Sequence, residues 1–411
     1  MAYSKYLNRF DFTTVTDRTG LDSSKWENIP IPNAKVEPGF SHIPMWVADM
    51  DFPTAPCVIA AIQARLAASP AMGYFNLANT GFYEAIKKWQ KERRGMDIGD
   101  DMDVISYENS VLGGVANVIR TYTEEGEPVL LHSPTYIGFT GTVNSAARRI
   151  VLSELVQDEE GVYRMDFEDM EKKIVDEKIK VAIFCNPHNP TGRVWSAEEI
   201  QGFVELCVKH DVHIIADEIW ADFIVGDTPF TPTQSVSELA RDKVASFSAC
   251  TKTFNLAGLV GAYSIIFNKE MRAECRRLAA QTHYNQPNIL SVHALVGAYN
   301  EGAPYVDALL EVIKKNMNDC YEIMQNEWHG LVKSQKPQGT YVMFYDWTKF
   351  CEERGKTMDE VLQKCVSVGA IIQDGRPFHG PCHSRINFAC PNSSAVEAFK
   401  RISKYVINAE W

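Results

Sequence analysis

The chain lacks any apolar run long enough to cross a membrane, and positive charge is in the minority. No stretch approaches the ~18 apolar residues of a membrane-spanning helix, so we expect no such helix. The 41 basic side chains are outnumbered by 53 acidic ones, which gives a net charge of −12. An acidic surface repels phosphate backbones and anionic lipid headgroups. This balance argues against nucleic acid or an anionic membrane as a main partner.

Several signatures of cysteine and glycine chemistry are also missing. The ten cysteines form no Cys-x-x-Cys pair, and four of them (Cys185, Cys207, Cys250 and Cys365) stand in apolar segments. Isolated thiols are typical of a reducing compartment, and residues 1–10 lack the apolar stretch of a secretory signal, so we expect a cytoplasmic protein. The chain contains neither Gly-x-Gly-x-x-Gly nor a Walker-type glycine pattern, so the nucleotide sites that these patterns build have no support.

The composition of the chain is that of a globular protein. From Val104 onward, patterns typical of strands alternate with patterns typical of helices. Apolar residues make up 45% of the 411 residues, and at ~150 residues per domain two or three domains are expected. Near-continuous apolar runs predict buried strands at residues 129–132, 181–185, 213–216, 244–247 and 262–267. Helical patterns separate these runs, and Ser196 and Glu199 form a capping box for a helix over 196–210. Such alternation predicts an α/β fold with a wound, mostly parallel sheet.

The last third of the chain has a different pattern. A long helix is predicted from Pro304 to about Trp328. A strand (340–347), a helix (358–367), a second strand (385–389) and a closing helix (394–406) follow it. We therefore expect a large domain over residues 51–290 and a smaller α+β domain over 291–411. The irregular N-terminal arm, residues 1–50, is expected to join the small domain.

Polar segments follow three of the predicted strands. Asn186–Gly192, with the sequence Asn-Pro-His-Asn-Pro-Thr-Gly, follows the strand at 181–185, and Asp217-Glu218 closes the strand at 213–216. Ser248–Asn255, which contains Lys252, follows the strand at 244–247. Each segment alone has an ordinary interpretation as a turn, an ion pair or a surface lysine. Because open α/β sheets bind ligands at the carboxyl ends of their strands, the three segments together predict one site.

The residue types at these strand ends suit a pyridine aldehyde cofactor. Lys252 has the amine that forms a Schiff base. Asp217 has the carboxylate that keeps the pyridine nitrogen protonated, so that the ring accepts electrons. Asn189 has an amide that donates to the phenolate oxygen of the ring. Hydroxyl groups beside Lys252 and free amides at a helix N-terminus bind the phosphate.

The motifs of the chain resemble the fold-type I, class I and II aminotransferases that use pyridoxal 5′-phosphate (PLP). Within that family they are most similar to the MalY/PatB-like cystathionine β-lyases, or C–S lyases. The resemblance spans nearly the whole chain. Its markers are Met45–Phe52, Gly73-Tyr74, Ser133–Tyr136, Asn186–Gly192, Asp217–Ile219, Thr251–Leu259, Gly339–Tyr341 and Arg385–Asn387. It implies the PLP-transferase fold, PLP as cofactor and an amino-acid substrate.

The resemblance also implies a role for single residues. Lys252 matches the Schiff-base lysine and proton shuttle, Asp217 the partner of the ring nitrogen, and Asn189 the partner of the phenolate oxygen. Tyr136 matches the aromatic residue stacked on the ring. Arg385 matches the arginine that binds the α-carboxylate of the substrate as a bidentate pair.

Further residues are implied around the phosphate and the substrate side chain. Tyr74 matches a tyrosine that reaches the phosphate from the neighbouring subunit, so the resemblance implies a homodimer with a shared site. The helix that begins near Val111 and Leu112 would supply backbone amides to the phosphate, and Thr251 a hydroxyl. Tyr74 and Trp46 are expected to contact the substrate. The sequence leaves open which substrate side chain the enzyme accepts.

Residues 110–113, Ser-Val-Leu-Gly, depart from the usual Thr-Pro-Gly-Val of the family, which leaves open which amides bind the phosphate. Two other positions also depart from the pattern of the family. Trp220 stands three residues after Asp217, where aminotransferases usually carry Tyr and C–S lyases often carry His. An indole N–H donates a hydrogen bond but accepts none, so a contact to the phenolate oxygen stays open while acid–base help is lost. Val260 replaces a phosphate-binding arginine of many aminotransferases, which favours the lyases.

The favoured function is therefore a PLP-dependent C–S β-lyase that converts a sulfur-containing L-amino acid to a thiol, pyruvate and ammonia. An aminotransferase that passes the amino group to a 2-oxo acid uses the same residues and is the alternative. A PLP-binding regulatory protein with low turnover is a further alternative. The group His379, Cys382 and His383 is a weak metal candidate, and a loop at the mouth of the cleft explains it better.

Overall fold

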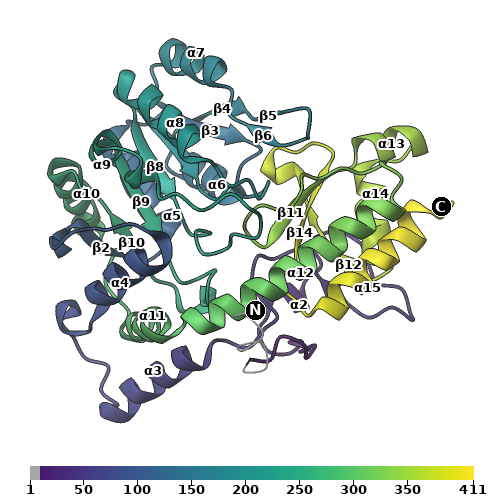
Figure 1. Cartoon of the computed structure of the whole chain (residues 1–411), viewed down its shortest axis with the longest axis horizontal. Coiled ribbons are helices and arrows are strands. Elements are labelled where there is room, and N and C mark those ends of the chain that lie inside the picture. Colours follow the sequence, from purple (N-terminus) through teal and green to yellow (C-terminus); the bar gives the residue numbers. More distant parts are fainter. Residues whose placement is uncertain (1–9) are drawn as a thin grey trace.

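The computed structural model describes residues 10–411, and its largest element is a seven-stranded sheet (Figure 1). In spatial order the strands are β2 (Ile105–Glu108), β10 (Ala262–Ile265), β9 (Val244–Ser248), β8 (His213–Asp217), β7 (Val181–Cys185), β3 (Pro128–Ser133) and β4 (Arg149–Glu154). Neighbouring strands from β9 to β4 are parallel, whereas β10 is antiparallel to both β9 and β2. The predicted α/β fold with a large, mostly parallel sheet is confirmed.

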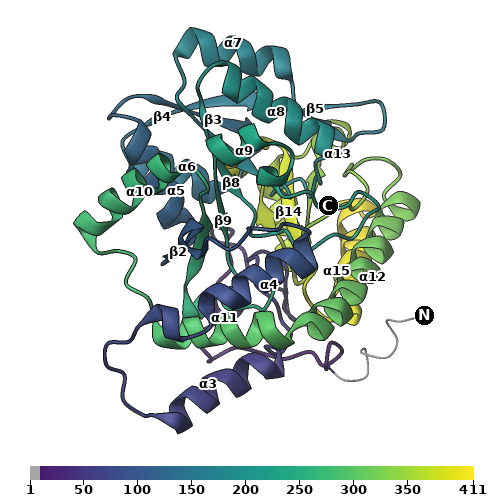
Figure 2. The ribbon, with the colours of Figure 1, turned by 60° about the vertical axis from the view of Figure 1, so that its left-hand side comes forward.

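Helices cover both faces of this sheet (Figure 2). On one face lie α7 (Phe167–Glu177), α8 (Ala197–Lys209) and α9 (Glu238–Lys243), and on the other α5 (Val111–Tyr122), α6 (Ile137–Ser145) and α10 (Lys269–Thr282). Along β7, Phe184 packs into the first layer, and Ile183 and Cys185 into the second. Burial on both faces is why the strands are continuous apolar runs rather than alternating ones.

A second, smaller sheet is formed by the C-terminal part of the chain. It contains β11 (Val342–Asp346), β14 (His383–Asn387) and β13 (Gln373–Asp374), with β14 antiparallel to both neighbours. The helices α12 (Ala303–Glu327), α13 (Thr348–Arg354), α14 (Met358–Ser367) and α15 (Asn392–Ile402) belong to this part of the chain. In the N-terminal arm, β1 (Ile43–Pro44) pairs in parallel with β12 (Ala370–Ile371). The arm is thereby tied to the C-terminal part.

The remaining elements are short or lie beside the large sheet. The helices α3 (Pro56–Ala68) and α4 (Phe82–Arg94) pack on α11 (Ile289–Glu301), while α2 (Ser24–Glu27) lies in the arm and β5 (Val156–Gln157) pairs with β6 (Tyr163–Arg164). Across residues 10–411 no helix has the length and apolarity that crossing a bilayer requires. The predicted boundaries at 50 and 290 remain predictions, and residues 1–9 of the predicted arm lie outside the described residues.

Local side-chain chemistry explains where the elements agree with the predicted ones and where they differ. The capping box of Ser196 and Glu199 is present at the start of α8. β11 begins at Val342 rather than at the predicted Thr340, because Thr340 has a φ of +63° and its Oγ1 accepts the amide of Val342. β14 ends at Asn387 instead of Ala389, where the Asn387 side chain accepts the Ala389 amide in a turn.

Candidate active site

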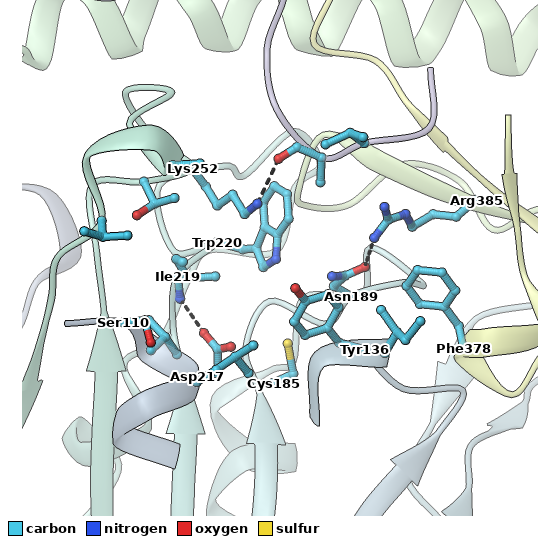
Figure 3. Close-up of a pocket in the computed structure, with 18 of the residues that line it drawn as sticks. Ser110, Tyr136, Cys185, Asn189, Asp217, Ile219, Trp220, Lys252, Phe378 and Arg385 are labelled. Atoms are coloured by element: carbon cyan, nitrogen blue, oxygen red, sulfur yellow. Dashed lines mark hydrogen bonds between the residues drawn. The ribbon is translucent and has the colours of Figure 1, made fainter. Parts of the chain in front are cut away.

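A cavity of about 390 Å³ opens at the carboxyl ends of β7, β8 and β9 (Figure 3). Cys185 pairs with Asp217, and Asp217 with Phe247, so these parallel strands end side by side. The segments that follow the strands therefore reach the same edge of the sheet, as predicted. Of the predicted site residues, the cavity is lined by Trp46, Val111, Leu112, Tyr136, Asn189, Asp217, Trp220, Thr251, Lys252 and Arg385.

Asp217 is the last residue of β8 and is buried between two neighbouring strands. One of its carboxylate oxygens accepts the backbone amide of Ile219 at 3.0 Å. Burial raises the pKa of Asp217 to about 7, although the Ile219 amide and the nearby Lys252 oppose the rise. A carboxylate in this environment gains stability from a cationic or proton-donating partner inside the cavity. A protonated ring nitrogen is such a partner.

Lys252 lies in the turn that follows β9, and its side chain reaches into the cavity (Figure 3). Its Nζ donates to the carbonyl oxygen of Ala48 at 2.8 Å and lies 5.5 Å from the ring centroid of Trp220. Burial and the positive charge of Arg385 lower the pKa of Lys252 to about 8. A neutral amine is the nucleophile and base in imine chemistry, and at this pKa the neutral form is accessible near neutral pH.

Arg385 lies on β14 of the small sheet and faces Lys252 across the cavity. It donates to the carbonyl oxygen of Trp46 at 3.0 Å and to Oδ1 of Asn189 at 3.3 Å. Its guanidinium group stacks 4.6 Å from the ring centroid of Phe378. The Nε atom of Arg385 is buried and has no hydrogen-bond partner in the described part of the chain. An anion with two oxygens would satisfy this donor, since guanidinium pairs with carboxylates in a bidentate manner.

The N-terminus of α5 forms another wall of the cavity. Ser110 caps the helix, and its Oγ accepts the amide of Gly113 at 2.9 Å. The first amides of a helix have no partner within the helix, so those of Val111 and Leu112 are available at the cavity wall. A Cβ at Gly114 would lie 2.1 Å from the ring of Phe247, so glycine is needed for α5 to pack this closely against β9.

Comparisons with known proteins agree with this arrangement. A sequence model of the family "Aminotransferase class I and II" matches residues 43–402. The chain belongs to this family. Cystathionine beta-lyase PatB of Bacillus subtilis is 30% identical over 95% of this chain and 98% of its own length. Protein MalY of Escherichia coli is 31% identical over 93% and 95%. The crystal structure of cystalysin from Treponema denticola, which contains PLP, has a TM-score of 0.85 and 30% identity, with 97% of this chain and 98% of that chain covered.

Trp220 is buried in the cavity wall of this member of the aminotransferase family. Its indole ring meets the ring of Tyr341 edge-on, with centroids 4.6 Å apart. Tyr136, whose pKa is raised by burial, also lines the cavity. Trp220 therefore packs between Lys252 and Tyr341, and its predicted contact with the cofactor stays a prediction. Val260 also lines the cavity and leaves this wall without a cation.

Tyr74 is the predicted site residue that the structure does not bring to this cavity. Its side chain is fully exposed, and it lines a separate surface hollow with Met72, Phe75, His283 and Asn288. Its predicted role depends on a second subunit and stays a prediction. At the weak metal candidate, His383 stacks on Phe344 with ring centroids 4.6 Å apart. Within residues 10–411 no group of three or more His, Cys, Asp or Glu side chains is placed to hold a metal ion.

Sequence reasoning missed how the arm segment 46–51 is held in the site. Besides Lys252, the hydroxyl of Tyr341 donates to the Ala48 carbonyl at 3.0 Å. The Asn387 amide donates to the carbonyls of Val47 and Asp49, and Asn255 bonds both backbone groups of Met50 at 3.0 Å. Tyr341, Asn387 and Asn255 all belong to markers of the resemblance, but nothing in their local sequence indicates this shared partner.

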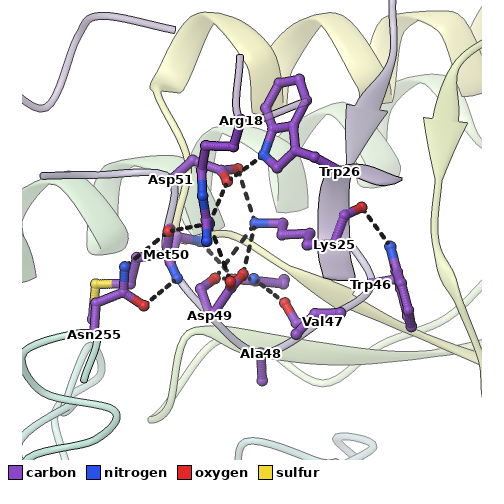
Figure 4. A network of polar contacts seen from close by, with 12 residues as sticks. Arg18, Lys25, Trp26, Trp46, Val47, Ala48, Asp49, Met50, Asp51 and Asn255 are labelled. Atoms are coloured by element: carbon purple, nitrogen blue, oxygen red, sulfur yellow. Dashed lines mark hydrogen bonds and ion pairs between the residues drawn. The ribbon is translucent and has the colours of Figure 1, made fainter. Parts of the chain in front are cut away.

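A network of ion pairs around the buried residues Lys25 and Asp51 also holds the segment 46–51 (Figure 4). The Nζ of Lys25 lies 2.8 Å from Asp51 and 3.5 Å from Asp49. Arg18 lies 3.1 Å from Asp49. The indole of Trp46 donates to the carbonyl of Lys25 at 3.0 Å. These contacts fix the segment whose carbonyls touch the two cations of the cavity.

Proposed function

We propose that this chain is a PLP-dependent C–S β-lyase, which eliminates a thiol from a sulfur-containing L-amino acid and yields pyruvate and ammonia. One observation carries the proposal. A lysine of lowered pKa, a buried aspartate and a buried arginine with an unpaired donor line a single cavity. Relatives with the names cystathionine beta-lyase and cystalysin, at about 30% identity over nearly the whole chain, support the lyase activity.

The residues present fit PLP. The amine of Lys252 would bind its aldehyde, and the carboxylate of Asp217 would pair with its ring nitrogen. Asn189 and Tyr136 line the same cavity, so the amide of Asn189 would donate to the phenolate oxygen and the ring of Tyr136 would stack on the cofactor ring. For the phosphate, the amides of Val111 and Leu112 and the hydroxyl of Thr251 are available, because a helix N-terminus attracts anions. The bound cofactor supplies an electron sink for the carbanion at Cα of the substrate.

The chain's own residues have three tasks in the reaction. Arg385 binds the α-carboxylate and so fixes the orientation of the Cα–H bond. Lys252 accepts the α-proton at Nζ, for which a pKa of about 8 is well matched to neutral pH. Asp217 holds the proton of the ring nitrogen in place. The walls formed by Trp220 and Tyr136 limit access of water while the thiolate leaves from Cβ.

The alternative function is an aminotransferase, and the description of the matched family favours it. The two reactions share the removal of the α-proton by Lys252. They differ in where a proton returns and in whether the sulfur leaves. Val260 at the cavity wall, in place of a cation, favours the lyase.

The proposal extends to a cytoplasmic homodimer. Tyr74 is fully exposed beside Met72 and Phe75, and in a dimer it would reach the phosphate of the neighbouring site. Cys185, Cys250 and Cys365 are buried free thiols, which is typical of a reducing compartment.

The decisive experiment uses purified protein with PLP and cystathionine, in the absence of any 2-oxo acid. We expect pyruvate in large excess over enzyme. Turnover that appears only after a 2-oxo acid is added would replace the lyase with the aminotransferase. A yellow protein that is inert with cystathionine, cysteine and common amino donors would favour the regulatory alternative. Lys252→Ala, which is expected to lose the visible absorbance of the bound cofactor, controls for PLP bound elsewhere.

A further inference from the structure

Two partly exposed cysteines from distant parts of the small sheet region lie in contact. The Sγ atoms of Cys351, on α13, and Cys382, in the loop before β14, are 3.5 Å apart. Both are free thiols. Seven other cysteines of the chain are buried, so reagents in solution reach this pair more readily than they reach those seven.

The backbone of a single buried residue holds both cysteines in place. The amide of Trp347 donates to the carbonyl of Cys382 at 2.9 Å, and the carbonyl of Trp347 accepts the amide of Cys351 at 2.9 Å. The Trp347 indole also donates to Ser384 at 2.9 Å. The contact between the two sulfurs therefore follows from the fold and does not depend on side-chain rotamers alone.

The loop that contains Cys382 also contributes to the candidate active site. It begins at Gly375, whose amide donates to the carbonyl of His383 at 2.8 Å. Phe378, in the middle of the loop, stacks on Arg385. Its carbonyl accepts the amide of Thr135 at 3.0 Å. A shift in the position of Cys382 can therefore move Phe378, which lies in the same loop and stacks on the guanidinium group of Arg385.

We propose that Cys351 and Cys382 are an oxidative modification site, at which a low-molecular-weight disulfide converts the two thiols to an intramolecular disulfide. The thiolate of Cys382 attacks the oxidant, forms a mixed disulfide and expels one thiolate. The thiolate of Cys351 then attacks the Cys382 sulfur and expels the second. The two cysteines lose two electrons and two protons, and the oxidant becomes two thiols.

The order of these steps follows from the surroundings of Cys351. Burial and the contact with Cys382 raise the pKa of the Cys351 thiol. Cys351 is also held within helix α13 while Cys382 lies in a loop, so we assign Cys351 as the resolving thiol. Bond formation shortens the separation of the sulfurs from 3.5 Å to ~2.05 Å. Cys351 belongs to the helix α13, whereas Cys382 lies in a loop, so the closure is expected to displace this loop, which contains Phe378, more than the helix.

The test is oxidation of the full-length protein with oxidised glutathione, followed by alkylation of the remaining thiols. Peptide mass analysis is expected to find Cys351 linked to Cys382, and dithiothreitol is expected to release the link. Cys57→Ser, which changes another partly exposed cysteine, should leave the link intact. Cys351→Ser should stop the reaction at the mixed disulfide on Cys382. If wild type also stops at mixed disulfides, or if the link joins other cysteines, the proposal fails.

A second measurement, which rests on the proposed function, addresses the consequence for the substrate. The oxidised protein is expected to show a KM raised about threefold or more with little change in kcat, because Phe378 no longer supports Arg385 in the same position. Cys382→Ser, treated with the same oxidant, should keep its KM. An unchanged KM in linked wild type overturns the effect on the site. Peptide mass analysis still reports on the link if the protein proves to have no lyase activity.

Discussion

The ammonium group of Lys25 lies 2.8 Å from the carboxylate of Asp51, and both side chains are buried. They are separated by 26 positions in an irregular arm. Asp51 also accepts a hydrogen bond from the indole of Trp26 at 2.9 Å. The pair therefore closes the arm against the segment 46–51 (Figure 4), whose first three residues line the candidate active site.

Removal of the cation from this pair should destabilise the fold. For Lys25→Met we expect a loss of about 3–5 kcal/mol in the free energy of unfolding, because the buried carboxylate of Asp51 loses its nearest cation and, within the described part of the chain, keeps only Trp26 and the more distant Arg18. Chemical denaturation of the protein measures this loss. Lys87→Met removes a cation from an exposed partner, Asp100, at a similar distance of 2.7 Å and should cost below about 1 kcal/mol. If the two variants lost equal free energies of unfolding, burial would not be what makes the pair of Lys25 and Asp51 important for stability.

The capture of PLP by the protein should depend on pH through Lys252. The reactive form is the neutral amine, and the pKa of Lys252 is lowered to about 8. The rate at which cofactor-free protein binds PLP should therefore rise about tenfold per pH unit below pH 8 and level off above it. Stopped-flow absorbance measures this rate. Arg385→Gln removes a positive neighbour that lowers this pKa, so the midpoint should move to higher pH. A midpoint that moves down would contradict the assignment.

The guanidinium group of Arg385 should matter for binding of the amino acid rather than for the chemical step. Arg385→Lys keeps the charge but loses the planar pair of donors. We expect KM to rise about tenfold to hundredfold, with a smaller change in kcat. Steady-state kinetics with the best lyase substrate measures both constants. Arg376→Lys, in the neighbouring exposed turn where Arg376 pairs with Asp374, is the matched control and should leave KM unchanged.

The charges of the cavity predict which substrate side chains are accepted. Among the residues that line it, Asp217, Lys252 and Arg385 are charged, and each already has a partner in the proposed reaction. A second carboxylate on the substrate would be buried without a cation, unless the substrate has its own ammonium group beside it, as cystathionine does. We expect kcat/KM for S-propyl-L-cysteine to exceed that for S-carboxymethyl-L-cysteine at least about tenfold. A preference for the acidic substrate would show that a cation from elsewhere reaches the site.

The sequence was informative where a functional residue follows directly from a regular element. Asn189, Asp217 and Lys252 each follow or end a buried strand, and parallel strands that are neighbours bring their ends together. The wound sheet and the capping box at Ser196 were predictable for the same reason, since period and composition are local properties.

Contacts between irregular segments could not be predicted in this way. No periodicity relates Lys25 to Asp51, or Cys351 to Cys382, and these pairs meet through the path of loops. The bond from Tyr341 to the Ala48 carbonyl depends on how the arm crosses the small sheet, which side-chain patterns do not encode. The position of Tyr74 relative to a neighbouring site likewise depends on assembly rather than on one chain.

The carbonyl groups of Trp46 and Ala48 already saturate part of the donor capacity of Arg385 and Lys252. In the proposed reaction, an arriving α-carboxylate competes with the main chain only for the guanidinium donor that now bonds Trp46, whereas the Nε of Arg385 has no partner within residues 10–411 to give up. Formation of the bond between Lys252 and the cofactor likewise releases the carbonyl of Ala48 from its contact with Nζ.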